Sequence, residues 1–138
     1  MPQYTFLTHP TPSHIEQILD LYTAAGWWER GPDDAALIKK LIAGSHCFLI
    51  AEFHDRLIGM GRVVSDGVSD AYIQDVTVLD EYRSQGIATG IVTRLLRRLQ
   101  ADRIDWIGLI AEGNTHDFYA RLGFTQMTDS APMVYKKT

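Results

Sequence analysis

A chain of 138 residues has the length of one domain, so we expect a single domain over residues 1–138. The formal net charge of −4 argues against general binding to nucleic acids, which favour basic surfaces. We expect no membrane span, because no apolar stretch approaches the ~20 residues that one needs, and no secretory signal. The single cysteine, Cys47, cannot form an internal disulfide and suits a reducing compartment, so the expected location is cytoplasmic.

The first half of the sequence predicts a strand, two helices and a hairpin. Ser13 and Glu16 have the spacing of a capping box, which marks the start of the first helix. Gly26 and Gly44 follow the apolar periodicity of the two helices and are expected to end them. The predicted elements are an edge strand over residues 4–7, the two helices, and interior strands over residues 47–53 and 57–64.

The second half predicts alternating strands and helices. Apolar residues recur in steps of three and four from Ile87 to Leu99, opposite arginines, which is typical of an amphipathic helix packed on a sheet. A strand precedes this helix and a short helix follows it. The predicted elements are strands over residues 71–79, 106–111 and 133–136, a helix over residues 116–122, and room for a further strand around residues 124–127.

A glycine loop joins the strand that ends at Leu79 to the amphipathic helix. Its residues are Arg83, Ser84, Gln85, Gly86, Ile87, Ala88 and Thr89. A strand that enters a helix through such a loop directs several free backbone N–H groups at one point, and the helix dipole favours an anion there. Gly86 and Ala88 would let a phosphate approach the backbone. Taken alone, the loop fits a simple strand-to-helix turn equally well.

Other ligand motifs are absent from the sequence. No Gly-Lys-Ser/Thr run ends a phosphate loop, and Gly59-Met60-Gly61 lies within a strand and lacks the third glycine of a dinucleotide fingerprint. The five histidines show no metal-ligand spacing, so no metal is expected.

Three segments carry a family resemblance. The pattern Arg83-x-x-Gly86-x-Ala88 resembles the phosphate-binding signature of the GNAT acetyltransferases. Residues 76–82 resemble the strand that approaches this loop, and residues 118–124 resemble the family's second signature. The resemblance extends from Tyr4 to Lys136. Within the family, Gly26-Trp27, residues 59–62, 65–67 and 73–76 are similar to the branch of plastid-type amine and lysine acetyltransferases and their bacterial relatives.

The resemblance implies an α/β (α+β) fold. Its mixed, mostly antiparallel sheet would have about 6–7 strands and about four flanking helices, and splayed central strands would form a slot for coenzyme A. It also implies an N-acetyltransferase that moves an acetyl group from acetyl-CoA to a primary amine by direct transfer in a ternary complex. Homodimers are common in the family, and one is compatible with this chain.

The resemblance also assigns residues to the donor. The backbone N–H groups of Gln85, Gly86, Ile87, Ala88 and Thr89 would hold the pyrophosphate, with Arg83 and Ser84 at its edge. The strand residues Val76, Thr77 and Val78 would lie along the pantetheine arm, with the backbone of Val76 and Val78 pairing with it. Asn114 is included among the cofactor residues, although many family members place an Asn where this chain has Glu112.

Two residues are the expected catalytic groups. Tyr119 matches the family tyrosine that donates a hydrogen bond or proton to the departing sulfur. Glu112 lies seven residues earlier, where the amine-acetylating branch carries an acid that can accept the proton of the amine. Asp75 is the rival base, because an acid within an otherwise apolar strand is unusual. A relay through water is the third alternative.

The acceptor side is less defined. Trp27 and Trp28 lie in the loop between the first two helices, where they could stack on an amine or cover the core, and Asp75 is counted with them as substrate-binding. The acceptor could be an aromatic amine, a polyamine, an aminoglycoside or a protein lysine, and another acyl donor stays open. The alternative function is a catalytically weak acyl-CoA sensor or partner-binding domain.

Overall fold

The structure, a computed structural model, describes residues 1–136. The chain forms two compact units, Met1–Gly108 and a second that begins at Leu109. The first unit contains the sheet, three helices and a short 3-10 helix. In chain order its elements are β1 (Gln3–Phe6), α1 (Pro12–Ala24), α2 (Asp34–Gly44), β2 (Cys47–Phe53), β3 (Arg56–Ser65), β4 (Asp70–Val78), η1 (Asp80–Tyr82), α3 (Ile87–Ala101) and β5 (Trp106–Gly108).

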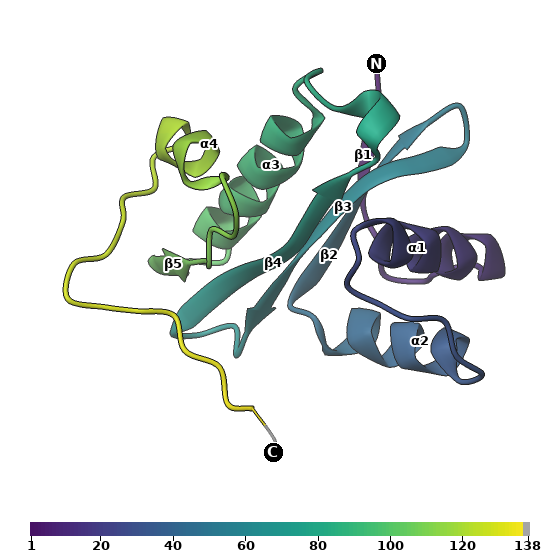
Figure 1. The fold of residues 1–138 in the computed structure, drawn as a ribbon, viewed down its shortest axis with the longest axis horizontal. Helices are drawn as coiled ribbons and strands as arrows, with labels where there is room; N and C mark the ends of the chain where they lie inside the picture. The colour runs from purple at the N-terminus through teal and green to yellow at the C-terminus, as the bar shows by residue number, and fades with distance from the viewer. Residues whose placement is uncertain (137–138) are drawn as a thin grey trace. The chain divides into compact units, whose positions relative to one another are not determined.

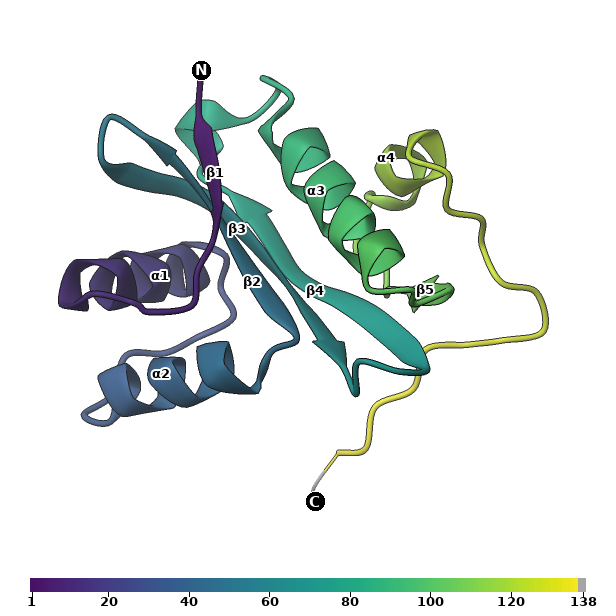
Figure 2. The ribbon, with the colours of Figure 1, turned by 180° about the vertical axis from the view of Figure 1, so that it is seen from behind.

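The strands of the first unit form one open sheet in the order β1-β2-β3-β4-β5. The first four strands are antiparallel, and β5 lies parallel to β4. This arrangement confirms the predicted mixed, mostly antiparallel sheet, with five strands within the described residues rather than 6–7. Helices α1 and α2 cover one face of the sheet, and α3 covers the other (Figures 1 and 2).

The core lies on both faces of the sheet because its central strands are buried on both sides. Phe48 and Ile50 of β2 belong to the cluster formed with α1 and α2. On the opposite face, Ile91 and Leu95 of α3 lie directly against Gly61 of β3. The near-continuous apolar run of β2 is therefore a strand covered on both faces, as its sequence predicts.

The pairing of β3 and β4 contains a β-bulge. One residue of β3, Gly61, faces two residues of β4, Asp75 and Val76. Asp75 adopts the left-handed backbone conformation, with φ of 58°. An extra residue of this kind bends its strand and changes the face at which the following side chains point.

The pairing of β4 with β5 is short. It joins Asp70 to Trp106, Ala71 to Ile107 and Tyr72 to Gly108, and it stops there. From Ile73 to Val78, β4 has β3 as its only strand neighbour within the described chain. The edge of β4 that includes the bulge is thus free of β5.

The second unit contains one helix, α4 (His116–Arg121). The predicted strand over residues 106–111 is wrong at its end, because β5 stops at Gly108. Residues 124–127 and 133–136 form no strand in the described chain. Met133, Val134 and Tyr135 are 92%, 78% and 90% exposed, so the apolar pattern that predicted the last strand is not buried. A strand requires a hydrogen-bonding neighbour, which a local sequence pattern does not supply.

The start of α1 differs from the sequence prediction. The capping box joins Thr11 and His14 rather than Ser13 and Glu16: the Thr11 hydroxyl accepts the His14 N–H, and the His14 ring accepts the Thr11 N–H, both at 3.1 Å. Pro12 occupies the first helical turn, where its missing N–H has no cost. Glu16 takes no part in the cap, and its carboxylate contacts Arg30 in the loop that follows α1.

Candidate functional site

The loop before α3 is shaped by two residues with positive φ. Ser84 has φ of 62°, and Gly86, the N-cap of α3, has φ of 80°. No atom lies within 4 Å of the position that a Cβ would take on Gly86. The glycine is therefore required by its backbone conformation, and the space beside it is open.

The backbone N–H groups of this loop are free. No acceptor is recorded, within the described part of the chain, for the N–H groups of residues 84–89. The first N–H of α3 that bonds back is that of Gly90, which donates to the Gly86 carbonyl at 3.0 Å. Unpaired N–H groups at the positive end of a helix dipole attract an anion, so the loop offers the backbone donors that the predicted phosphate site requires.

Arg83 is tied to the end of β4. Its Nε donates to the Val78 carbonyl at 3.2 Å, and its Nη1 lies 3.2 Å from the Asp80 carboxylate. The side chain is still 61% exposed. These contacts hold a cation beside the loop, but the first also occupies the carbonyl of Val78, whose backbone the family resemblance assigns to the pantetheine arm.

The donor strand residues lie just after the bulge. Val76 and Thr77 are half-buried and Val78 is buried. They occupy the stretch of β4 that β5 leaves unpaired. A strand edge with free backbone groups can pair with an extended amide-bearing ligand as if the ligand were another strand.

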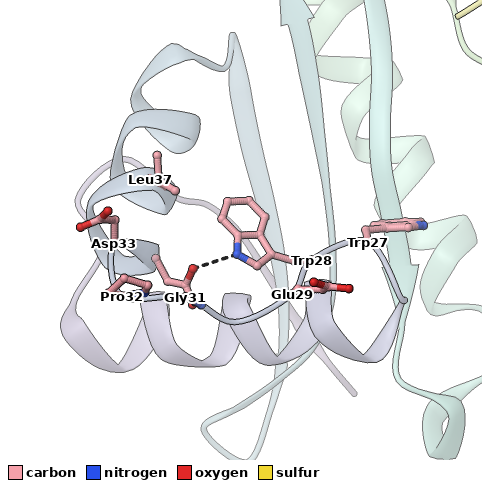
Figure 3. Close-up of a pocket in the computed structure, with 8 residues that line it drawn as sticks. Trp27, Trp28, Glu29, Gly31, Pro32, Asp33 and Leu37 are labelled. Carbon is pink, nitrogen blue, oxygen red and sulfur yellow. Dashed lines mark hydrogen bonds between the residues drawn. The ribbon is translucent and has the colours of Figure 1, made fainter. Parts of the chain in front are cut away.

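The two tryptophans of the α1–α2 loop have different surroundings (Figure 3). The Trp28 indole packs against the core cluster and donates its N–H to Asp34 at 2.9 Å. Trp27 is 46% exposed and lies apart from it, against the ring of Tyr22 at a centroid distance of 6.3 Å. Trp28 therefore stabilises the loop, whereas Trp27 has a face available for a ligand.

An ion network fixes this loop, and the sequence did not reveal it. Asp34 is buried at 6% exposure and accepts hydrogen bonds from Trp28, Arg30 and the Gly31 backbone. These hydrogen bonds and the Arg30 guanidinium lower the pKa of Asp34. Arg30 also contacts Glu16 at 2.7 Å and Asp20 at 3.3 Å on α1. The spacing of Glu16 and Asp20, one helical turn apart, is the only signal that the sequence offered.

The loop borders an open hollow of about 360 Å³. Its walls combine aromatic, aliphatic and acidic groups, which include Trp27, Glu29, Asp33 and Leu37 (Figure 3). Such a lining suits a cationic ligand better than an anionic one, because carboxylates and aromatic faces both attract cations.

Asp75 contacts two side chains from other elements. The Tyr22 hydroxyl on α1 donates to its Oδ2 at 2.6 Å, and Nε of Arg62 on β3 donates to the same oxygen at 2.5 Å. Burial and the Asp75 contact both raise the pKa of Tyr22. The sequence singled out Asp75 as an unusual acid within a strand, but it did not identify these two partners.

In the second unit, Tyr119 lies on α4 among aromatic residues. Its ring contacts Phe118 at 4.9 Å and Phe124 at 5.7 Å between centroids. The side chain is half-buried, and this burial raises its pKa. The three aromatic residues come from the second sequence signature and form its local packing.

Glu112 and Asn114 lie in the exposed segment before α4. The sequence pattern placed Glu112 at the end of a strand, but β5 ends at Gly108, four residues before Glu112. The Glu112 carbonyl accepts the Thr115 hydroxyl at 2.7 Å, which closes a turn. Its carboxylate makes no recorded contact within the described chain, so it is open to solvent or ligand.

Other kinds of site find no support among residues 1–136. No group of three or more potential metal ligands comes together there. Nor does any described helix combine the length and apolar character that a membrane crossing requires. Burial raises the pKa of Cys47 to about 11, so this thiol is a poor nucleophile.

Residues 13–124 match the acetyltransferase (GNAT) family. A Glycine max protein named "Probable acetyltransferase TAP2" is 30% identical over 146 residues, covering 90% of this chain and 59% of that protein. The Arabidopsis thaliana protein "GCN5-related N-acetyltransferase 2, chloroplastic" is 44% identical over 69 residues, covering 50% of this chain and 27% of that protein. The chain thus spans less than two thirds of either relative.

The fold also has solved counterparts. A protein of meticillin-resistant Staphylococcus aureus, described as a probable acetyltransferase, superposes with a TM-score of 0.81 at 25% identity, covering 100% of both chains. The expected fold class is thereby confirmed.

The Asp34 network generates a prediction for stability. We expect Asp34→Asn to lower the free energy of unfolding at neutral pH, because it removes the charge that pairs with Arg30. The pKa of Asp34 is lowered by folding, so its contribution is present above the ordinary aspartate value of about 3.9 and is lost as pH falls below it. Urea denaturation at pH 7 and pH 3 measures this.

The matched control is Asp33→Asn, whose side chain makes no capping hydrogen bond. The difference in free energy of unfolding between wild type and Asp34→Asn should be smaller at pH 3 than at pH 7. The control should have the wild-type free energy of unfolding at pH 7. An Asp34→Asn variant as stable as wild type at pH 7 would contradict the assigned role.

Proposed function

Because the chain belongs to the acetyltransferase (GNAT) family, we propose that it transfers an acetyl group from acetyl-CoA to a primary amine. The observation that carries this proposal is the loop before α3, whose N–H groups at residues 84–89 are free and surround an open glycine. This cradle fits a pyrophosphate. Beyond Tyr72, the edge of β4 has no strand beside it, and before Val78, whose carbonyl Arg83 occupies, this edge fits the amide-bearing pantetheine arm.

The proposed acceptor is a small or lysine-like cationic amine. The hollow beside Trp27 is lined by the carboxylates of Glu29 and Asp33, and the net charge is −4. Both features disfavour an anionic acceptor such as a sugar phosphate. The homodimer and the cytoplasmic location stay predictions. The name of the Arabidopsis relative refers to the chloroplast.

The reaction needs two proton movements. A cationic amine first gives a proton to the proposed base, Glu112, and its nitrogen then forms a bond to the thioester carbonyl carbon. The carbon–sulfur bond breaks, the thiolate leaves with the electron pair, and the remaining ammonium proton neutralises it. Tyr119 would donate a hydrogen bond to the developing thiolate.

Burial favours hydrogen bonding over full proton donation by Tyr119. The pKa of the Tyr119 hydroxyl is raised, so it binds its proton more tightly than an ordinary tyrosine. A thiolate of the cysteine type has a conjugate-acid pKa of about 8.5, well below that of tyrosine. A neutral hydroxyl that stabilises sulfur charge is therefore the role we assign.

Donor binding tests the cradle. We expect wild type to bind acetyl-CoA in calorimetric titration and Gly86→Glu not to bind, because the glutamate brings a negative charge and a disfavoured φ of 80° to the phosphate position. Gly44→Ala, at the end of α2 with no atom within 4 Å of the new Cβ, is the control. Equal affinity in a folded Gly86→Glu variant would reject the cradle.

Turnover tests the enzyme against the acyl-CoA sensor. With acetyl-CoA and a panel of aromatic amines, polyamines, aminoglycosides, lysine peptides and phosphorylated amines, we expect thiol release with a cationic amine. Tyr119→Phe keeps the ring packing and should lower kcat by about ten- to a thousandfold with little change in acetyl-CoA affinity. Binding without release across the panel would favour the sensor, and a fully active Tyr119→Phe would leave Tyr119 a packing residue.

The pH dependence of Glu112→Gln tests the base. We expect its rate deficit to shrink as pH rises, because free amine then forms without help. Asp117→Asn, an exposed acid on α4, is the matched control. A Glu112→Gln enzyme with the wild-type rate at every pH would transfer the role to water or to another carboxylate.

A further inference from the structure

The bulge in β4 places two consecutive polar side chains on one face of the sheet. Side chains of a regular strand alternate between faces, yet Gln74 and Asp75 both contact the guanidinium of Arg62. After the extra residue, Val76 points at the opposite face, where its Cγ2 lies 3.2 Å from the Cβ position of Gly61. The bulge thus sets the direction of every residue of β4 that follows it.

The side chain of Asp75 is held from two directions. The oxygen that accepts Tyr22 and Arg62 belongs to a carboxylate that is 23% exposed, and the Arg62 side chain is 17% exposed. Arg62 is in turn anchored to the Ser45 hydroxyl at 3.3 Å. A charge in so enclosed a place requires a partner, and here the guanidinium supplies it.

The backbone of Asp75 depends on the same contacts. A φ of 58° is uncommon for residues other than glycine, although Asp and Asn accept it more readily than most. A strand with no bulge would turn Asp75 toward the Ile91 and Leu95 side of the sheet, where it would lose both partners. The side-chain contacts therefore favour the bulged register over the regular one.

We infer that Asp75, held by Arg62 and Tyr22, is a positioning residue that fixes the β4 bulge and so aims the backbone of Val76–Val78 at the donor. This inference rests on the proposed function for its consequence, since Val76–Val78 is the stretch assigned to the pantetheine arm. It also distinguishes Asp75 from a base, because the guanidinium of Arg62 already balances the charge of the carboxylate, whose Oδ2 accepts hydrogen bonds from Tyr22 and Arg62.

The network reaches the acceptor side through Tyr22. The ring of Tyr22 lies 6.3 Å from that of Trp27 and 5.6 Å from that of Trp28, while its hydroxyl holds Asp75. Tyr22 is only 3% exposed, so its position is fixed by the core. The same side chain thereby supports the α1–α2 loop and the donor strand.

Asp75→Asn is the primary variant, because Asn keeps the shape and tolerates positive φ but removes the charge. We expect it to weaken acetyl-CoA binding and to lower kcat. The two losses combined should amount to about ten- to a hundredfold, and this factor should be the same at every pH. Arg62→Met should behave in the same way, and the double variant should be little worse than either, because the two residues act as a unit. Tyr22→Phe, which removes one hydrogen bond only, should show a smaller loss.

Hydrogen exchange supplies a readout that does not depend on activity. We expect faster exchange of the Val76–Val78 amides in Asp75→Asn, with the exchange of α3 unchanged. Asp70→Asn, an exposed acid at the start of the same strand, is the control and should alter neither exchange nor kinetics.

Three outcomes would overturn the inference. A deficit in Asp75→Asn that disappears at high pH would make Asp75 a base. A lower unfolding midpoint with unchanged acetyl-CoA affinity and kcat would make the network structural only. Unchanged exchange at Val76–Val78 would show that the bulge does not need the carboxylate. Failure of wild type to bind acetyl-CoA would instead reject the proposed function, and the exchange measurement would still decide the role of Asp75 in the bulge.

Discussion

The contact between Arg62 and Asp75 is the interaction on which we infer that the bulged pairing of β3 and β4 depends. Helix α3 approaches β3 so closely that a Cβ on Gly61 would lie 2.8 Å from Ile91, so this face accepts only small or well-fitted apolar groups. The bulge satisfies that requirement by directing Val76 toward α3 and Asp75 away from it, where Arg62 neutralises the charge. The pairing with β5 ends at Tyr72, before the bulge, so the bent part of β4 keeps a free edge.

Two kinds of physical interaction shape the two proposed binding regions of the first unit. The loop before α3 offers free backbone N–H groups, so its geometry depends on a left-handed glycine and on the start of a helix rather than on particular side chains. The α1–α2 loop depends on side chains: Arg30 joins three carboxylates, and Trp28 donates to the buried Asp34.

The sequence predicted what local periodicity determines and missed what depends on distant partners. The helical spacing of apolar residues predicted α3 correctly, and the continuous apolar run predicted β2 correctly. The glycine loop was located by its place between a strand and a helix. The bulge left no periodic signal, because one extra residue in β4 only interrupts the alternation of apolar and polar residues, as many strand sequences do. The strand predicted over residues 133–136 is wrong for the related reason that pattern does not provide a hydrogen-bonding neighbour. The capping box was misplaced because Ser13 and Glu16 matched the preferred residue types. In the structure the N-cap is Thr11, and the His14 ring accepts the Thr11 N–H in place of a glutamate.

An acid within a strand can have three roles in a protein of this family: a base, an anchor for a cationic ligand, or part of the framework. The sequence pattern indicated only the first two roles for Asp75. The structure separates them by the partners of the Asp75 carboxylate. A base and an anchor for a cation both act through a charge that no neighbour already balances. Asp75 gives one oxygen to both Tyr22 and Arg62, and the guanidinium balances its charge. The carboxylate of Glu112 has no such contacts in the described chain, so we assign the two acids different tasks: Asp75 is proposed to hold the strand, and Glu112 is proposed as the base.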